Sequence, residues 1–395
     1  MNSPKRRFVA GALALTLVAA ACGSDDAADT NTETEAPAET DEASETDEAA
    51  ETDEAAETES SASASGTLIG AGASSQAAGM QGWQAGFQAA NPDATVEYDP
   101  IGSGGGRETF LSGGSDFAGS DAALKDDEFE MSKERCAGDL GAINLPHYIS
   151  PIAIPYNLPS IEGSTVKLTP ELIAGIFANE ITNWTDPAIA EVNPDIEFPD
   201  LAVNPVHRSD DSGTTENFTD YMAQAAPDIW TFGAIEPWDV DGPGGGEGAP
   251  QTSGVVAAVA AGEGSIGYAD ASQIGDLPAA AVGVAGEFVE FSPEAAGRIV
   301  DASERTGGRS EFDFAIEVNR TPETADSYPI ALVSYHIVCL QYEDQETVDL
   351  VKAFMTYVGS EQGQADGAAA AGSAPISDEV RSEILVSLDQ ITAAG

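Results

Sequence analysis

The feature that most constrains the fold of this chain is a unit that occurs three times between residues 67 and 122. In each unit a short apolar stretch, which predicts a β-strand, ends in a turn rich in glycine and serine. Small residues at such turns permit positive φ angles and close approach of the backbone to a ligand. The three turns are Gly70–Ser75, Ile101–Arg107 and the end of Asp116–Ala122.

A helical pattern follows the first turn, because Met80, Trp83, Phe87 and Ala90 are spaced to fall on one face. A second helix carrying Phe110 is expected after the second turn. Strands that alternate with helices predict an α/β fold. In an open α/β sheet, ligands collect outside the carboxyl ends of the strands, where these turns lie.

A fourth stretch, residues 207–215, has the sequence His-Arg-Ser-Asp-Asp-Ser-Gly-Thr-Thr. An amphipathic run over 216–225 follows it, so a loop that opens a helix is expected. The first NH groups of a helix lack partners within it, and the helix dipole adds positive charge there. With Arg208 and two hydroxyls nearby, the stretch is a candidate anion site. The alternative is that Asp211 or Ser212 only caps the helix.

The first 22 residues have the pattern of an export signal: a Lys-Arg-Arg segment, an apolar stretch over Phe8–Ala21, and small residues before Cys22. Val18–Gly23 resembles a bacterial lipobox, which implies cleavage before Cys22 and attachment of lipid to its sulfur. The alternative is an ordinary secretory signal in which the cysteine is incidental.

Residues 23–65 predict a disordered acidic linker, since they hold sixteen Asp or Glu and no Lys or Arg, and lack aromatic residues. Like charges should keep this linker extended. The remainder, 66–395, is also acidic, with 52 acidic and 12 basic residues, or a formal charge of −40. Nucleic acids and anionic membrane surfaces require basic patches, so both are excluded as partners of the folded part.

The second half of the chain continues the alternation of strands and helices. An apolar run, Ile330–Leu340, predicts a buried strand that contains Cys339. The other expected elements are strands at 152–156, 202–206 and 266–268, and helices beginning at Thr169-Pro170 and spanning 216–225, 254–261, 347–358 and 378–388.

The sequence offers little for catalysis, a metal or a cofactor. It has no G-x-S-x-G elbow, and no lysine follows a glycine, which excludes a P-loop. The three cysteines form no CxxC or Cys/His cluster. His207 precedes Ser212 by five residues, so a serine hydrolase stays open as an alternative. A binding protein for a small oxyanion fits better, because the Gly/Ser turns and the 207–215 stretch supply many hydrogen-bond donors.

Four segments match, in order, the ligand-binding segments of the PstS-type phosphate-binding proteins, the substrate-binding components of the phosphate ABC importer. Additional matches at 181–189 and 264–268 extend the resemblance over residues 66–390. The four segments are Gly70–Ser75, Ile101–Gly106, Ser120–Ala122 and Arg208–Thr214.

This resemblance implies a two-lobed periplasmic-binding-protein-like fold of type II, with crossing strands between the lobes and a ligand cleft between them. Residues 66–151 and 328–395 would form lobe I, and 152–327 would form lobe II. Cys136 and Cys339 would then share lobe I, and an exported protein can form the disulfide between them.

The resemblance also assigns roles in binding. Asp210 would orient the charged donor, Arg208. Two residues depart from the family pattern: Ser75, where relatives often have an apolar residue, and Asp211, which replaces a common glycine. The hydroxyl donors would be Ser74, Ser103, Ser212 and Thr214, and the backbone donors would be the NH groups of Ser75 and Gly213.

Asp121 would decide which anion is bound. A carboxylate inside an anion site requires a ligand that carries a proton, as phosphate does at neutral pH and sulfate does not. Two hydrogen-bond acceptors that face each other in a desolvated site are costly. Such a site can therefore favour the ligand that carries the proton by a factor of roughly 10⁴–10⁵.

The sequence therefore predicts a lipid-anchored protein, on the extracytoplasmic side of the cell membrane, that binds inorganic phosphate and delivers it to the permease and ATPase subunits of an ABC transporter. No catalysis is expected. The alternatives are a binding protein for another tetrahedral oxyanion, and a secreted serine or phosphoester hydrolase that uses Ser212.

Overall fold

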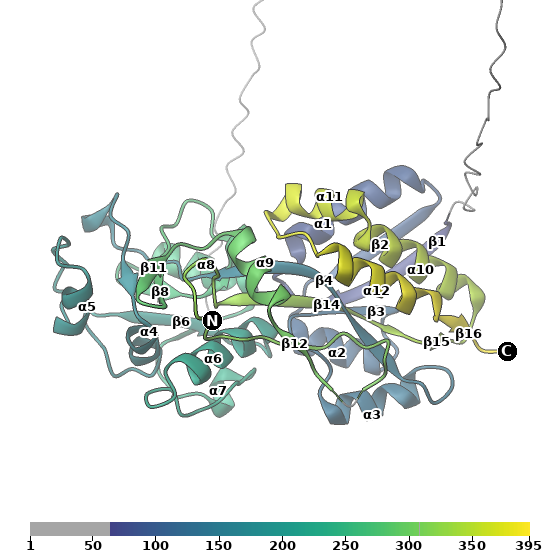
Figure 1. Cartoon of the computed structure of the whole chain (residues 1–395), viewed down its shortest axis with the longest axis horizontal. Helices are drawn as coiled ribbons and strands as arrows, with labels where there is room; N and C mark the ends of the chain where they lie inside the picture. The colour runs from purple at the N-terminus through teal and green to yellow at the C-terminus, as the bar shows by residue number, and fades with distance from the viewer. Residues whose placement is uncertain (1–63, 308) are drawn as a thin grey trace, which may run out of the picture. The chain divides into compact units, whose positions relative to one another are not determined.

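The structure is a computed structural model that describes residues 64–307 and 309–395 (Figure 1). The predicted signal segment, the lipid attachment at Cys22 and most of the acidic linker lie outside these residues. Within the described part of the chain, no helix is both long enough and apolar enough to span a bilayer.

The largest sheet has six strands, and β1 lies parallel to both of its neighbours, β2 and β3. The strand β14 pairs antiparallel with β3 and with β4, and β9 pairs antiparallel with β4. The predicted α/β fold is confirmed. In spatial order the strands are β2 (Ala94–Asp99), β1 (Gly66–Gly72), β3 (Phe117–Ser120), β14 (Ala331–Cys339), β4 (Ala142–Ala153) and β9 (Ala269–Asp270).

Helices lie on both sides of this sheet (Figure 1). Met80, Trp83 and Phe87 of α1 are buried, as their spacing predicts, whereas Ala90 is exposed because the helix ends there. α1 packs against α10 and α11, and α2 packs against β1 and β3. The helices are α1 (Ala77–Ala90), α2 (Ser103–Leu111), α3 (Asp126–Arg135), α10 (Gln345–Gly359), α11 (Glu361–Ala371) and α12 (Asp378–Asp389).

A second group of strands contains two three-stranded sheets. One is fully parallel, in the order β7 (Glu247–Ala249), β6 (Asn204–Arg208), β8 (Ser265–Gly267). The other has the order β11 (Glu287–Val289), β10 (Ala281–Val284), β5 (Lys167–Leu168). The helices of this group are α4 (Pro170–Phe177), α5 (Pro187–Val192), α6 (Gly213–Ala225), α7 (Trp238–Asp241) and α8 (Gln251–Ala261). The next helix, α9 (Pro293–Asp301), packs against β4 and β14.

Short elements complete the described chain. Two of them are 3₁₀ turns, η1 (Pro159–Ile161) and η2 (Ala271–Gln273). Two small two-stranded sheets are formed by β12 (Glu304–Arg305) with β13 (Ile316–Glu317), and by β15 (Gln341–Tyr342) with β16 (Thr392–Ala393).

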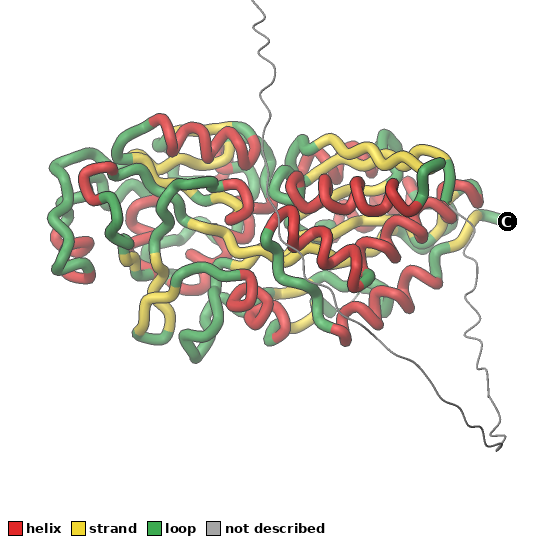
Figure 2. The backbone as a smooth tube through the Cα atoms, turned by 90° about the horizontal axis from the view of Figure 1, so that it is seen from above, coloured by secondary structure: helices red, strands yellow, loops and turns green. Residues whose placement is uncertain are grey.

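Two antiparallel strands connect the six-stranded sheet with the second group. β4 and β14 run side by side between them (Figure 1), and Figure 2 shows strands, in yellow, that pass from one group to the other. The chain continues past β4 to bridge Pro155 with Ala279 and Tyr156 with Ile266. The predicted strand at 330–340 is confirmed, but the strand expected at 152–156 is wrong in extent. The observed strand, β4, begins at Ala142, and the two prolines in this segment obscured the strand pattern in the sequence.

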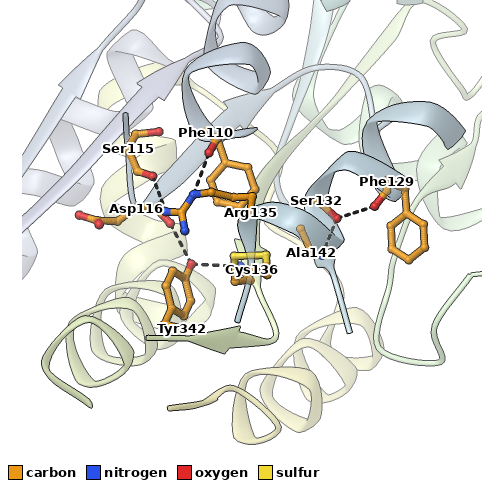
Figure 3. The surroundings of a disulfide bond; sticks show 10 residues. Phe110, Ser115, Asp116, Phe129, Ser132, Arg135, Cys136, Ala142 and Tyr342 are labelled. Carbon is orange, nitrogen blue, oxygen red and sulfur yellow. Dashed lines mark hydrogen bonds between the residues drawn. A yellow bond between two sulfur atoms is a disulfide. The ribbon is translucent and has the colours of Figure 1, made fainter. Parts of the chain in front are cut away.

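A disulfide joins Cys136, at the end of α3, to Cys339, at the end of β14 (Figure 3). This is the pair that the resemblance implied. Both cysteines are buried. Nearby, Arg135 donates to the Phe110 carbonyl at 2.9 Å, and Tyr342 Oη accepts from Cys339 N at 3.0 Å. The bond therefore fixes α3 to the C-terminal end of β14, at the edge of the sheet opposite to the one where Asp121 follows β3.

Removal of this disulfide is expected to destabilise the protein, because it closes a loop of 203 residues and so restricts the unfolded chain. We predict that a reductant lowers the free energy of unfolding by about 2–4 kcal/mol. The measurement is thermal unfolding with and without reductant. In the Cys136→Ser/Cys339→Ser double variant the midpoint should be low and insensitive to reductant. An unchanged wild-type midpoint under full reduction would contradict the prediction.

Candidate functional site

The sheet brings three of the sequence-predicted segments together. Ser74 and Ser75 lie in the turn between β1 and α1, Ser103 is the first residue of α2, and Asp121 directly follows β3. Because β1 is parallel to both β2 and β3, the turns that follow these strands meet at one edge. All four side chains are buried.

The fourth segment arrives from the parallel sheet of the second group. β6 ends at Arg208, and α6 begins at Gly213 with Ser212 as its N-cap, since Ser212 Oγ accepts from Thr215 N at 3.2 Å. Gly213 lies directly against Asp121: a Cβ atom at Gly213 would be 2.9 Å from the Asp121 Cβ. The absence of a side chain therefore allows the start of α6 to contact the end of β3. Ser212 therefore caps α6, and this capping does not exclude an anion site at the same end of the helix.

The Asp121 carboxylate lies at the centre of this contact and is 3% exposed. Three hydroxyls donate to it. Ser75 Oγ lies 2.6 and 2.8 Å from its two oxygens, Ser334 Oγ lies 2.6 Å from Oδ1, and Thr214 Oγ1 lies 2.7 Å from Oδ2. Burial raises the pKa of Asp121, and the bonds from Ser334, Ser75 and Thr214 oppose that rise.

The backbone of Asp121 is held as firmly as its side chain. Its NH donates to Ser103 Oγ at 3.1 Å, and its carbonyl accepts from Asn217 Nδ2 at 2.7 Å. Asn217 lies on α6 and Ser103 on α2, so elements from both groups of strands position this residue.

Arg208 is 2% exposed, and its positive charge lowers the pKa of Asp121. Its guanidinium is held by Asp210, whose Oδ1 accepts from Nε at 2.7 Å and whose Oδ2 accepts from Nη2. Burial would raise the pKa of Asp210, but the bonds and charge of Arg208 outweigh it, so the net shift is downward. Arg208 Nη1 also lies 3.4 Å from Thr214 Oγ1. The arginine is therefore oriented toward the α6 start.

The structure adds polar residues that the sequence did not indicate. Ser74 Oγ lies 3.0 Å from Thr252 Oγ1, on α8, and accepts from Thr252 N at 3.1 Å. Gln273 Nε2 donates to the carbonyls of Ser74 and Ser75. Neither Thr252 nor Gln273 lies in a recognisable motif. Ser334 did have a signal, because it is a small polar residue inside the mainly apolar run Ile330–Leu340.

Asp211 neither caps α6 nor contacts Asp121. Its carbonyl accepts from Gly104 N at 3.1 Å, and a Cβ atom at Gly104 would lie 2.6 Å from the Asp211 Cβ. Burial and the negative Glu236 raise the pKa of Asp211. The Asp211 side chain thus lies against the first turn of α2.

The arrangement does not support a Ser/His hydrolase. The His207 ring stacks on Trp238 at a centroid distance of 4.8 Å, and its Nδ1 lies 2.9 Å from the Arg208 carbonyl. No hydrogen bond joins His207 to Ser212 in the residues described. The same residues contain no group of His, Cys, Asp or Glu that could hold a metal ion.

Comparison with known proteins places this chain in a family. Residues 57–362 match the family model of a PBP superfamily domain. The phosphate-binding protein PstS3 of Mycobacterium bovis (strain BCG / Pasteur 1173P2) is 34% identical over 331 residues, covering 82% of this chain and 86% of the relative. The chain belongs to the PstS-type phosphate-binding proteins. The PstS of Xylella fastidiosa (strain Temecula1 / ATCC 700964) is 32% identical over 292 residues, covering 72% of this PstS-type chain and 76% of the relative.

Solved structures support the PstS-type fold. A high-affinity periplasmic phosphate-binding protein (PfluDING) bound with phosphate has a TM-score of 0.65 at 22% identity, covering 81% of this chain and 93% of that chain. A phosphate-binding protein from Stenotrophomonas maltophilia has a TM-score of 0.62 at 22% identity, with the same coverage. The predicted two-lobed, type II periplasmic-binding-protein-like fold is confirmed.

A second buried carboxylate lies near the site. Asp270, on β9, is fully buried and accepts from Tyr148 Oη at 3.1 and 3.2 Å and from Ser272 N at 2.9 Å. Burial raises its pKa to about 6, and the negative Asp121 adds to this rise.

The raised pKa of Asp270 predicts a pH-dependent stability. A carboxyl whose folded pKa exceeds its unfolded value stabilises the protein fully below the unfolded pKa, and that stability is lost as pH rises through the folded pKa. Between about pH 4 and pH 6, Asp270→Asn should therefore gain about 2 kcal/mol of unfolding free energy relative to wild type. Denaturant unfolding across this pH range measures the difference. Asp195→Asn, at an exposed position, is the control. A difference that does not change with pH would refute the assignment.

Proposed function

We propose that this protein binds inorganic phosphate outside the membrane and delivers it to the permease and ATPase subunits of a phosphate ABC transporter. The observation that carries the proposal is Asp121, a buried carboxylate surrounded by hydroxyl donors and facing Arg208. The chain's curated relatives are named phosphate-binding proteins.

The donor set suits a protonated tetrahedral oxyanion. Hydroxyls of Ser74, Ser103, Ser212 and Thr214, the NH groups of Ser75 and Gly213, and the Arg208 guanidinium would bind the phosphate oxygens, while Asp210 fixes the arginine. Asp121 would accept the proton that phosphate carries. Charge-assisted hydrogen bonds in a water-excluded site are stronger than those in water, so the anion is held without a metal.

The wider organisation of the chain fits this role. We propose lobe I as residues 66–151 and 328–395 and lobe II as 152–327, with β4 and β14 as the crossing strands. Attachment of lipid at Cys22, with residues 23–65 as an acidic linker, would keep the lobes close to the transporter. In this proposal the protein carries out no catalysis.

A buried ion network spans the two proposed lobes. Arg107, on α2, donates to Glu236 through Nη1 at 2.9 Å and Nη2 at 2.7 Å, and both side chains are 1% exposed. Glu128 binds the Nε of the same arginine at 3.0 Å, and Lys125 Nζ lies 2.5 Å from Glu236. Burial opposes the charge of Glu236, but Arg107 and Lys125 hold its pKa below the usual value. The network would therefore stabilise the closed arrangement of the lobes.

Calorimetric titration tests the proposed function. Wild type should bind phosphate and reject sulfate. Asp121→Asn should lose most of this preference, because an amide can donate to sulfate and the acceptor conflict disappears. We expect the phosphate-to-sulfate affinity ratio to fall by about 100-fold or more. Equal affinity of the wild type for both anions would contradict phosphate specificity and favour another tetrahedral oxyanion.

The interlobe network gives a second expectation. Glu236→Gln keeps the shape of the side chain but removes the charge that pairs with Arg107 and Lys125. Phosphate affinity should fall by about tenfold, since loss of a buried charged hydrogen bond costs about 1.5–3 kcal/mol and the penalty falls on the closed form. Glu130→Gln is the matched control, because the Glu130–Lys133 pair lies exposed on α3. An equal affinity in the Glu236 and Glu130 variants would show that the network plays no part in closure.

A further inference from the structure

We infer that Ser334 and Gln76 are specificity-determining residues: together they keep Asp121 a hydrogen-bond acceptor, so that only an oxyanion carrying a proton is retained. This inference rests on the proposed function, because it concerns the anion that Asp121 faces. Neither residue belongs to the four ligand-binding segments. Gln76 is the N-cap residue of α1, Ser334 lies on the crossing strand β14, and both are fully buried.

The orientation of the Gln76 amide follows from its partners. Its Nε2 lies 3.2 Å from the Tyr335 carbonyl, a group that can only accept a hydrogen bond. The nitrogen must therefore face Tyr335. Its second hydrogen points to Ser334 Oγ, 2.6 Å away. On the other side, Gln76 Oε1 lies 3.5 Å from Tyr98 Oη, whose single hydrogen donates to the Ala73 carbonyl at 3.0 Å, so it is the Tyr335 carbonyl that fixes the amide orientation.

The orientation of the Ser334 hydroxyl follows in turn. A serine hydroxyl has one hydrogen, and here its oxygen already accepts from an amide that cannot accept in return. The hydrogen must point to Asp121 Oδ1, 2.6 Å away. β14 shifts register against β4 between Ser334 and Tyr335, and an irregularity of this kind can re-aim a side chain. The Ser334 hydroxyl therefore has a fixed direction and donates to Asp121 Oδ1.

The other two hydroxyls on Asp121 are less constrained. Thr214 belongs to the proposed ligand donors, so its hydroxyl would turn toward a bound anion, and Ser75 has no second side-chain partner among the hydrogen bonds of its Oγ. Ser334 is the hydroxyl that keeps its direction whether or not an anion is present. Among the three hydroxyls, Ser334 is therefore the one whose support of the ionised Asp121 does not change when an anion binds.

Protonation of Asp121 would abolish the discrimination. A neutral carboxyl can donate to a fully ionised oxyanion, so sulfate would be accepted along with phosphate. Burial and a bound anion both favour that neutral form. The charged and titratable groups that face Asp121 are Arg208 on β6, Asp270 on β9 and Tyr98 on β2. Of these, only Arg208 favours the ionised form, and the Gln76–Ser334 pair supplies the additional support.

The test is calorimetric titration of phosphate and sulfate at several values between about pH 5 and pH 8, with wild type and Ser334→Ala. Loss of a charged hydrogen bond should shift the pH at which sulfate begins to bind upward by about one to two units. At the acidic end the phosphate-to-sulfate ratio of Ser334→Ala should fall at least about tenfold below that of wild type. Asp270 is present in both proteins, so its own titration cancels in the comparison.

Three further variants sharpen the result. Ser334→Thr retains the hydroxyl and should restore the wild-type pH profile. Gln76→Leu frees the Ser334 hydroxyl to rotate and should shift the profile in the same direction as Ser334→Ala, so the inference can be tested even if that variant fails to fold. Ser265→Ala removes a fully buried hydroxyl that has no contact with Asp121 and should match wild type.

Two outcomes would overturn the inference alone. The first is a wild-type phosphate-to-sulfate ratio at every pH in Ser334→Ala and Gln76→Leu. The second is an equal fall in affinity for both anions without a pH shift, which would show only looser packing. If the wild type bound no phosphate, the proposed function would fail, and the inference with it.

Discussion

Burial of the Asp121 carboxylate is the interaction on which the site depends. An ionised carboxylate inside a protein is costly unless hydrogen bonds and opposite charge compensate it. Here three hydroxyls donate to its oxygens, Ser103 and Asn217 hold its backbone, and Arg208 supplies the opposite charge. These groups come from the turn after β1 and from α2, β14, β6 and α6. A change in the placement of any of these elements would leave the carboxylate undercompensated, so the geometry of the fold and the chemistry of the site are coupled.

The parallel pairing of β1 with β2 and β3 explains why the site forms where it does. Parallel strands place their following turns at one edge, and glycine lets the backbone approach closely there. Gly213 illustrates the requirement, because the start of α6 would clash with Asp121 if position 213 carried a side chain. The crossing strand β14 then introduces Ser334 from a distant part of the sequence, and Gln76 fixes its hydroxyl. In the function proposed above, anion recognition and connection of the lobes therefore share one strand.

The strongly acidic character of residues 66–395 does not conflict with anion binding. Charges more than about 8–10 Å apart are largely screened at physiological salt, whereas the buried donors of the site are not. Acidic residues also contribute to structure, since Glu236 and Glu128 compensate the buried Arg107. The net charge thus affects the surface and the solubility of the protein, whereas the local arrangement of donors determines which ligand it prefers.

The sequence by itself determined the α/β class, the buried strand at 330–340 and the four turns with their hydroxyls, arginine and aspartates, because these depend on local periodicity and on short motifs. It missed the start of β4, whose prolines obscure the strand pattern, and the helix α11, rich in alanine and glycine. Only the tertiary structure decided the partners of those motifs. Ser334 lies 213 residues from Asp121, and Thr252 lies 178 residues from Ser74. Contacts of this kind are set by strand register and by the packing of separate elements, and a one-residue shift in β14 would turn Ser334 to the opposite face of the sheet.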